Sequence, residues 1–302
     1  MNAIKPTPPS HRPFWVVAHR GVRTDAHLQR MAPENTLPAF QEAARQNAAI
    51  ELDVMSTADN RVIVHHDNLT GRIFALPGEP KTIAETPWAE LRNAQLNPAG
   101  HEASVARMLN NTGEYQTPEA FRAVRIPELQ DVLTALPTTH LFVEIKPNTI
   151  HESTLTENTL NIIRAHQAQE RVTLISFDPR CLRMAKQVAP ELKTALNCTI
   201  PERWQNNVPF LWLFTHLYIK NWLKADGIQP DYDSATPALI QQGKAAGLQV
   251  VPWVSGQTRE EEAAAFPRLI ASGVDGLITN AVDLLNEALQ TVQTRPPNAP
   301  DV

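Results

Sequence analysis

The sequence predicts an α/β fold in which parallel strands, joined by helices, close into a barrel. Short apolar runs typical of strands alternate with segments of helical periodicity along most of the chain. The chain has 302 residues, a length that suits one large α/β barrel. About eight strand-like runs in roughly 270 residues favour a closed barrel over an open sheet.

The predicted elements follow one another in a regular order. The strands are WVVAH (15–19), IELDV (50–54), VIVHH (62–66), LFVEIK (141–146), RVTLISF (171–177), KTALNC (193–198), LQVVPWV (248–254) and DGLIT (275–279). Helical segments include ENTLPAFQEAARQN (34–47), one beginning near IPELQDVL (126–133), NTLNIIRAHQAQ (158–169) and TPALIQQGKAAG (236–247). Such alternation predicts parallel strands joined by crossover helices.

The chain is predicted to form a single barrel domain over residues 14–290. Residues 1–13 and 291–302 are polar and rich in proline, and we expect them to be flexible. Residues 73–125 interrupt the alternation with few strand signals and little helical period. We interpret them as an insertion, because loops of this length in a compact domain are usually functional or form a small subdomain.

Composition narrows the class of protein. A net charge of -5 argues against a nucleic-acid partner, although one or two local cations suffice for a phosphate substrate. The sequence contains no apolar run of about 18 residues, so we expect no stable membrane insertion. The N-terminus has no apolar signal region, which favours a cytoplasmic location, or a periplasmic one if a leader is missing from this sequence. Cys181 and Cys198 are expected to be free, buried thiols.

One stretch, PERWQNNVPFLWLFTHLYIKNWL, contains six aromatic residues between Trp204 and Trp222. It is typical of a barrel helix that packs its apolar side on the strands. The alternative is an apolar wall, or a contact with a membrane surface, for a lipid-like substrate.

Carboxylates stand inside two of the predicted strands. Glu51 and Asp53 are two residues apart, so they point to the same face, about 7 Å apart at their Cα atoms. Glu144 and Lys146 repeat this spacing in LFVEIK. Three carboxylates on neighbouring strands would repel one another in a barrel interior, and a hard cation such as Mg²⁺ or Ca²⁺ would remove that cost. An ion pair of Lys146 with Glu144 or Asp53 is the structural alternative.

Two histidines end predicted strands. His19, followed by Arg20, ends the first strand, and His66 ends VIVHH. In a parallel barrel these ends share one rim, where active sites form. Two imidazoles, a cation site, an arginine and a lysine together indicate phosphodiester cleavage by acid–base catalysis. His65 points away from His66 and is expected to be structural.

At these residues the sequence resembles the glycerophosphodiester phosphodiesterase family, in the superfamily of phospholipase C-like phosphodiesterase barrels. The resemblance covers most of residues 14–287. The matching motifs, in the family's order, are HRG (19–21), APENTLPAF (32–40), IELDV (50–54), VIVHHD (62–67), IPELQDVL (126–133), VEIKP (143–147), ISFD (175–178), VVPWV (250–254) and GVDGLITN (273–280).

The resemblance implies a TIM (β/α)8 barrel with a small inserted subdomain after the second strand. It implies metal-dependent hydrolysis of glycerophosphodiesters to sn-glycerol 3-phosphate and an alcohol. By the motifs they match, His19 and His66 would be catalytic, and Glu51, Asp53 and Glu144 would hold one divalent cation, Mg²⁺ or Ca²⁺. The residues that would bind or support the substrate are Arg20, Lys146, Glu34, Asn35 and Trp253.

Three segments depart from the family pattern: the longer connection VRTDAHLQRMA between HRG and PENT, VSG after Trp253, and ITNAV where ITD and a later proline are usual. They bear on the specificity for the alcohol or the glycerol.

Several questions stay open at this stage. We favour His19 as base and His66 as acid, by similarity to related phospholipase barrels, and the reverse assignment remains. The nucleophile is either water or the glycerol 2-hydroxyl. The alternatives to the main function are a lysophospholipase D-like activity on longer-chain lipids and a non-catalytic phosphodiester-binding module. Homo-oligomerisation is also left open.

Overall fold

The structure of the protein is a computed structural model that describes residues 14–22, 32–109, 116–146, 152–254, 256 and 258–294. The predicted flexible segments fall almost entirely outside these ranges, since residues 1–13 and 295–302 are not among them. The longer connection after HRG also lies mostly outside, at residues 23–31.

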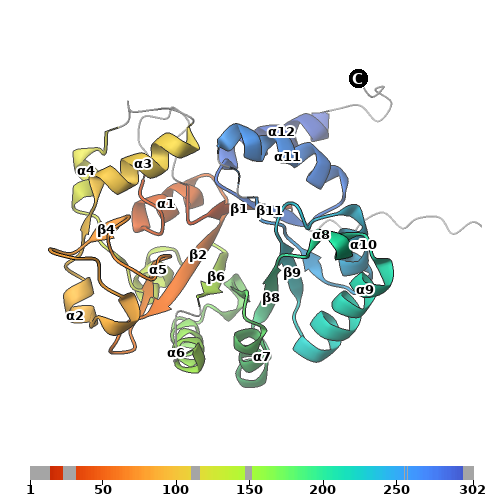
Figure 1. Cartoon of the computed structure of the whole chain (residues 1–302), viewed down its shortest axis with the longest axis horizontal. Coiled ribbons are helices and arrows are strands. Elements are labelled where there is room, and N and C mark those ends of the chain that lie inside the picture. Colours follow the sequence, from red (N-terminus) through yellow and green to blue (C-terminus); the bar gives the residue numbers. More distant parts are fainter. Residues whose placement is uncertain are drawn as a thin grey trace, which may run out of the picture.

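Eight parallel strands form a barrel, which confirms the predicted fold class (Figure 1). They are β1 (Trp15–His19), β2 (Ala49–Ser56), β6 (Leu141–Ile145), β7 (Val172–Ser176), β8 (Lys193–Cys198), β9 (Gly227–Pro230), β10 (Gln249–Val250) and β11 (Gly276–Thr279). Neighbours follow the order β10-β9-β8-β7-β6-β2-β1-β11. A parallel bridge between Trp253 and Ile278 closes the ring, and the Val254 N–H donates to the Ile278 carbonyl at 2.9 Å.

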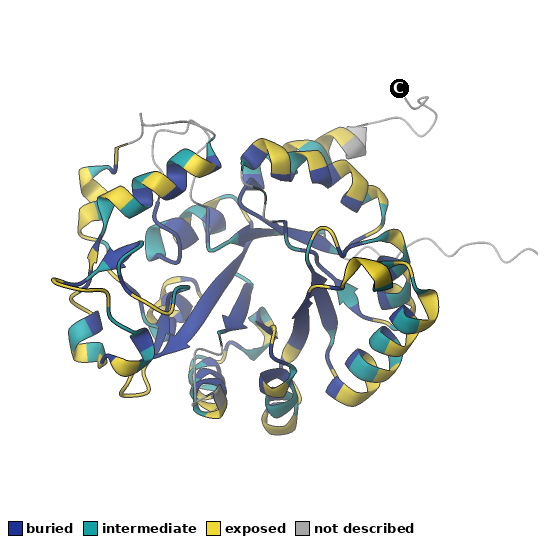
Figure 2. Cartoon of the chain, viewed as in Figure 1, coloured by how far each residue is buried: buried dark blue, intermediate teal, exposed yellow. Residues whose placement is uncertain are grey.

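Helices surround the barrel and bury their inner faces against it (Figure 2). They are α1 (Leu37–Arg45), α5 (Leu129–Ala135), α6 (Glu152–Ala165), α7 (Pro179–Val188), α10 (Pro237–Ala245), α11 (Arg259–Ala271) and α12 (Val282–Thr294), with the short η2 (Gln169–Arg171) before β7. The sequence contains recognisable capping signals at the N-termini of several of these helices. Asp178 and Thr236 cap helices whose first residue is proline, and Thr258 forms a capping box with Glu261.

The barrel interior changes from apolar to polar along the strands. One interior cluster contains residues from seven strands or their immediate ends, namely Val17, Ala49, Phe142, Ile175, Ala195, Val251 and Ile278. Two residues further along four of these strands stand His19, Glu51, Glu144 and Asn197. Since side chains two apart share a face, these polar residues lie above the apolar layer, toward the carboxyl ends of the strands.

The segment VIVHH was wrongly predicted to be a parallel barrel strand. Strand β3 (Val62–Val64) pairs antiparallel with the far end of β2, with Val54 opposite Val64. Residues 57–61 form a tight turn, closed by a bond from the Thr57 N–H to the Arg61 carbonyl, and are too few for a crossover. The chain therefore runs back along β2, and this return brings His66 to the rim of the barrel.

Strand β9 (Gly227–Pro230) is the barrel strand between β8 and β10, and it was missed by the sequence prediction. Its sequence, GIQP, contains only one residue that favours strands. Pairing with both β8 and β10 stabilises this segment as a strand, although its local strand propensity is low.

The insertion follows β2 and β3 and has an apolar core of its own. Its elements are β4 (Phe74–Ala75), η1 (Ile83–Glu85), α2 (Trp88–Leu91), β5 (Gln95–Leu96), α3 (Pro98–Met108) and α4 (Glu119–Arg122). The core includes Ile73, Phe74 and Leu91, which pack against Met55 of β2 and Ile63 of β3. This packing fixes the insertion on the outer end of the long strand β2, beside the rim.

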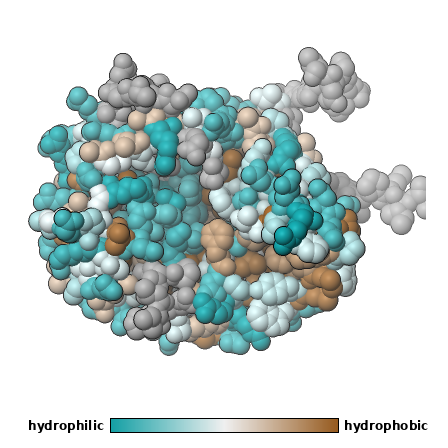
Figure 3. Space-filling view, in the orientation of Figure 1, coloured by the Kyte–Doolittle hydropathy of each residue, from teal (hydrophilic) through white to brown (hydrophobic). Residues whose placement is uncertain are grey.

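The aromatic segment forms α8 (Glu202–Gln205), α9 (Val208–Trp212) and the π-type helix η3 (Leu213–Leu223). Leu211, Ile219 and Leu223 are buried against the barrel, as predicted for a barrel helix. Other members, including Trp212 and Trp222, remain about half exposed, and Figure 3 shows hydrophobic atoms gathered at the lower right of this face, where α9 lies in Figure 1.

One smaller expectation is confirmed. Cys181 and Cys198 are free and buried, and burial raises the pKa of the Cys198 thiol to about 12. None of the described helices combines the length and the apolar character that crossing a membrane requires.

The surroundings of His140 predict that the stability of the fold falls in acid. Its ring lies 4.6 Å from that of Trp15, and its Nε2 contacts the Thr173 hydroxyl at 3.0 Å. Burial, together with Lys193 and Arg171, lowers the pKa of His140 from 6.5 to about 4. Because folding favours the neutral ring, this stabilisation is complete above pH 6.5 and is lost as the pH falls toward 4.

We therefore expect the free energy of unfolding to fall by up to about 3 kcal/mol between pH 6.5 and 4 from this group. His140→Phe should flatten that part of the profile in urea denaturation at a series of pH values. The control His216→Phe, on the outer helix η3, should keep it. Equal slopes in all three proteins would contradict the prediction.

Candidate active site

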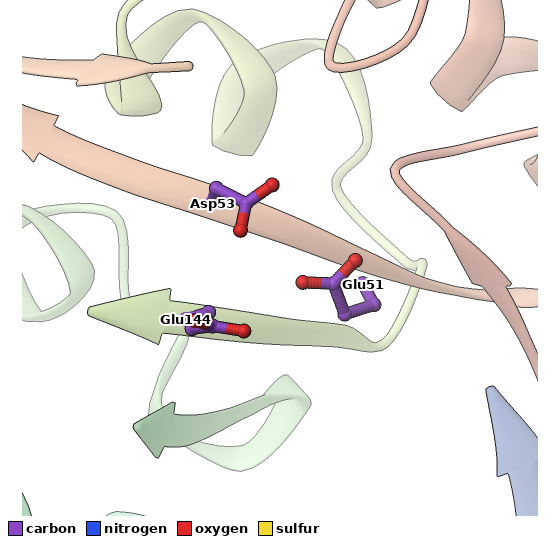
Figure 4. Close-up of side chains that lie close together, drawn as sticks. All are labelled: Glu51, Asp53 and Glu144. Atoms are coloured by element: carbon purple, nitrogen blue, oxygen red, sulfur yellow. The ribbon is translucent and has the colours of Figure 1, made fainter. Parts of the chain in front are cut away.

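Three buried carboxylates meet inside the barrel. Glu51 and Asp53 project from β2, and Glu144 projects from the adjacent strand β6, where it is the register partner of Asp53 (Figure 4). Each offers a carboxylate oxygen, and these oxygens lie within 4.8 Å of one another. The i, i+2 spacing in β2 therefore produces the cluster that the sequence predicts.

The charges of this cluster are not balanced by the side chains around it. Arg20 Nε and Lys146 Nζ lie 3.3 and 3.4 Å from Asp53 oxygens, and Lys146 also lies 3.0 Å from Glu144. The structural ion pair considered for Lys146 thus exists. It leaves three carboxylates facing two cationic side chains, and Arg20 is shared with Glu34.

The unbalanced negative charge shifts the pKa values of the three carboxylates. Burial and the neighbouring carboxylates raise the pKa of Glu51 well above its ordinary value and also raise the pKa of Glu144. Burial opposes ionisation of Asp53 as well, but Arg20, Lys146, His66 and the Asn35 amide bring its pKa below the ordinary value. The cluster offers three carboxylate oxygens, the ligands that a hard divalent cation prefers. A bound cation would also stabilise the ionised forms of the two glutamates whose pKa values are raised.

The two predicted catalytic histidines face the same cavity. It is lined on its polar side by His19, Arg20, Glu51, His66, Glu144 and Lys146. His19 Nε2 lies 3.9 Å from Glu51, and its Nδ1 lies 3.1 Å from the Asn280 side-chain oxygen. His66 Nδ1 lies 2.8 Å from Asp67. His65, expected to be structural, is buried, and burial lowers the pKa of its ring.

The HRG turn holds Arg20 and His19 at the rim. Arg20 adopts φ 57°, and its backbone N–H donates to Glu51 at 3.0 Å. Gly21 follows at φ 86°, and a Cβ there would come within 2.8 Å of Ala39 in α1. Glycine is required at this position by both the backbone conformation and the close approach of the helix.

Gly21→Ala is expected to destabilise the fold by about 2–5 kcal/mol, from the left-handed conformation and the clash together. Gly78→Ala is the matched control, because Gly78 has φ 89° and, its chain neighbours aside, no atom of a described residue lies within 4 Å of the place that an added methyl group would take. The control should cost only about 1–2 kcal/mol. Chemical denaturation of the two variants separates conformation from contact, and equal losses would contradict the role of Ala39.

Glu34 and Asn35, predicted to bind the substrate or to support the site, are buried and are not among the residues that line the cavity. The Asn35 side chain donates to Asp53 at 2.8 Å, and Glu34 accepts from Arg20 at 2.8 Å. Trp253 does line the cavity, next to Phe177, with their rings 6.1 Å apart.

Sequence reasoning missed four groups that complete the site. Arg72 joins Glu34, at 2.7 Å, to Asp67, also at 2.7 Å, and so connects the partner of Arg20 to the partner of His66. The others are Asn197, Gln229 and the pair Glu262–Asn280. Asn197 had a recognisable signal, a polar residue at the end of a predicted strand. Arg72 and Gln229 had none.

None of the aromatic residues in 204–222 lines this cavity in the described structure, so the segment does not form the apolar wall considered from the sequence. Apolar contacts at the cavity come instead from Ile175, Phe177, Trp253, Val254 and Ile278.

Comparisons with known proteins agree with this arrangement. The profile of the glycerophosphoryl diester phosphodiesterase family matches residues 19–284. A glycerophosphodiester phosphodiesterase of Caldanaerobacter subterraneus is 28% identical over 275 residues, covering 89% of this chain and 95% of that protein.

Two solved structures share the fold. An Oleispira antarctica phosphodiesterase in complex with the product sn-glycerol-3-phosphate has a TM-score of 0.69 and 22% identity, covering 91% of this chain and 96% of that one. A glycerophosphodiester phosphodiesterase from Agrobacterium tumefaciens has a TM-score of 0.65 and 19% identity, covering 91% and 99%. This chain belongs to the glycerophosphoryl diester phosphodiesterase family.

Proposed function

We propose that this protein hydrolyses glycerophosphodiesters to sn-glycerol 3-phosphate and an alcohol. The observation that carries the proposal is the cavity in which the carboxylate cluster, Arg20, Lys146 and two histidines converge. A phosphodiester needs positive charge for its oxygens and a proton acceptor and donor on either side of the phosphorus, and this cavity offers both.

In this proposal Glu51, Asp53 and Glu144 hold one divalent cation, Mg²⁺ or Ca²⁺. When bound, the cation would polarise a phosphoryl oxygen and offset its developing charge. Arg20 and Lys146 add positive charge on the same side of the cavity. They also keep Asp53 ionised, so that one ligand of the cluster is ready before a cation arrives.

The neighbours of the two histidines favour His19 as base and His66 as acid. Glu262 accepts from the Asn280 amide nitrogen at 2.5 Å, so the amide oxygen of Asn280 faces His19 Nδ1. An acceptor there keeps the proton on Nδ1 and leaves Nε2 as the proton acceptor. His66 instead contacts Asp67, a carboxylate whose pKa is held low by His66 and Arg72 despite partial burial, so that an imidazolium formed at His66 would have a charged hydrogen-bond partner.

A second candidate is lysophospholipase D-like hydrolysis of longer-chain lipids. Phe177 and Leu69 lie beside the cavity mouth and are 46% and 49% exposed, so an acyl chain could contact them. Comparing turnover of glycerophosphocholine and lysophosphatidylcholine separates the two functions. A clear preference for the short diester excludes the second.

The test of the proposed function is release of glycerol 3-phosphate from a panel of glycerophosphodiesters. Protein stripped of metal should be inactive and should regain turnover with Mg²⁺ or Ca²⁺. Binding of the diesters without turnover under any of these conditions would indicate a non-catalytic phosphodiester-binding module.

A further inference from the structure

The polar layer of the barrel interior is divided into two halves of different chemistry. Strands β1, β2 and β6 contribute a histidine and the carboxylates. Strands β8 and β9 contribute two neutral amides, Asn197 and Gln229, which are register partners on adjacent strands. Both amides line the same cavity as Glu51 and His19. The charged half suits a phosphate and a cation, and the amide half suits neutral polar groups.

The amide half carries buried polar atoms that have no partner among the described residues. Gln229 is 1% exposed, and neither its amide oxygen nor its amide nitrogen has a hydrogen-bond partner. The Asn197 amide oxygen and the Trp253 indole nitrogen are also buried and unpaired. Buried polar groups are nearly always satisfied in folded proteins, so several unpaired atoms on one wall of a cavity point to a ligand.

The orientation of Asn197 defines what this wall requires. Its amide nitrogen donates to Glu144 at 3.1 Å, so its oxygen can only accept. Gln229 can donate and accept, and Trp253 can only donate. A wall with two acceptors and two kinds of donor matches neighbouring hydroxyl groups, since each hydroxyl both donates and accepts. It does not match a quaternary ammonium or an alkyl chain.

We propose that Gln229, with Asn197 and Trp253, binds the two free hydroxyls of the glycerol moiety. This inference rests on the proposed function and adds to it the residues that select glycerol over another alcohol. The bond from Asn197 to Glu144 joins the hydroxyl-binding wall to the carboxylate cluster. Glycerol and phosphate are therefore held by one connected set of side chains.

The test measures binding of two phosphate monoesters to the full chain in Mg²⁺ by calorimetry. sn-Glycerol 3-phosphate carries both hydroxyls, and propyl phosphate lacks them. Wild-type protein should bind glycerol 3-phosphate about tenfold or more tightly than propyl phosphate. Gln229→Leu should weaken binding of glycerol 3-phosphate about tenfold and leave propyl phosphate within about twofold.

The matched control is Gln249→Leu, the same exchange in strand β10 at a residue that does not line the cavity. It should leave both affinities unchanged. Equal affinity of wild-type protein for the two ligands would overturn the proposal, as would an equal effect of Gln229→Leu on both. If Gln229→Leu does not fold, equal wild-type affinities would still overturn the proposal, and Trp253→Phe, which removes the indole N–H, takes its place as the variant with the same expected result.

Failure of the glycerol-binding inference can be distinguished from failure of the proposed function. Absence of glycerol 3-phosphate release from every diester would refute hydrolysis, whereas the calorimetric preference depends only on binding. Conversely, an active enzyme that binds both monoesters equally would retain its proposed function and lose the glycerol wall.

Discussion

Replacing Glu51 with glutamine is expected to lower kcat/KM for a glycerophosphodiester by about a thousandfold, the equivalent of several kcal/mol of charge stabilisation. Glu51 is the carboxylate of the cluster that no lysine or arginine side chain pairs with in the described structure. His19 Nε2 lies 3.9 Å from its carboxylate, which also accepts the Arg20 backbone N–H. We therefore expect it to depend most on a bound cation.

The same change should have the opposite effect on the stability of metal-free protein. Glutamine keeps the acceptor for the Arg20 N–H and removes a charge that Asp53 and Glu144 repel. In EDTA the variant should unfold at an equal or higher temperature than wild type. Added Mg²⁺ or Ca²⁺ should raise the unfolding temperature of wild type and have little effect on the variant.

Glu85→Gln, at an exposed residue of the insertion, is the matched control and should behave as wild type in both assays. A Glu51→Gln protein that keeps cation-dependent turnover would contradict the assignment of this ligand. A variant that loses activity and also unfolds at a lower temperature in EDTA would indicate a structural role instead.

The period of the strands explains why the carboxylate cluster could be predicted. Glu51 and Asp53 interrupt an apolar run at positions that share one face, and Glu144 does the same in another run. A carboxylate in a buried strand must be paired or bind a cation, so the residue type indicates the site without knowledge of the pairing. The structure adds that β2 and β6 are neighbours and that Asp53 and Glu144 are in register.

Two strand assignments failed because pairing with other strands, which local composition does not reveal, decides where a segment lies. VIV has the composition of a barrel strand, yet the short turn before it forces an antiparallel return along β2. GIQP has almost no strand propensity and forms a barrel strand because β8 and β10 lie on either side. The prediction of about eight strands therefore matched the barrel's number while one member was wrong.

The supports of the histidines were hidden for the same reason. Asn280 contacts His19 across 261 positions of sequence, and its own partner Glu262 lies on α11. No periodicity links these residues. Asn280 is the residue at which ITN departs from the family's usual aspartate, and it places a neutral hydrogen-bond acceptor beside His19 Nδ1.

This difference between the two imidazoles leads to the second prediction of large effect. His19→Gln and His66→Gln should each lower kcat for glycerophosphocholine by about 10²–10⁴, the usual contribution of acid–base catalysis. A diester with p-nitrophenol in place of choline needs no protonation of its leaving group. On that substrate His66→Gln should lose less than about tenfold, while His19→Gln should keep its full loss, because the nucleophile must still be deprotonated.

The variant that recovers activity on the p-nitrophenyl substrate identifies which histidine is the general acid. Rescue of His19→Gln alone would reverse the assignment and show that a carboxylate neighbour makes His66 the base. Equal losses on both substrates would contradict a separate acid and base. In the expected case, the two neighbours divide the two proton transfers: the amide oxygen of Asn280 accepts from Nδ1 and leaves Nε2 of His19 as the proton acceptor, whereas the Asp67 carboxylate can pair with the imidazolium form of His66.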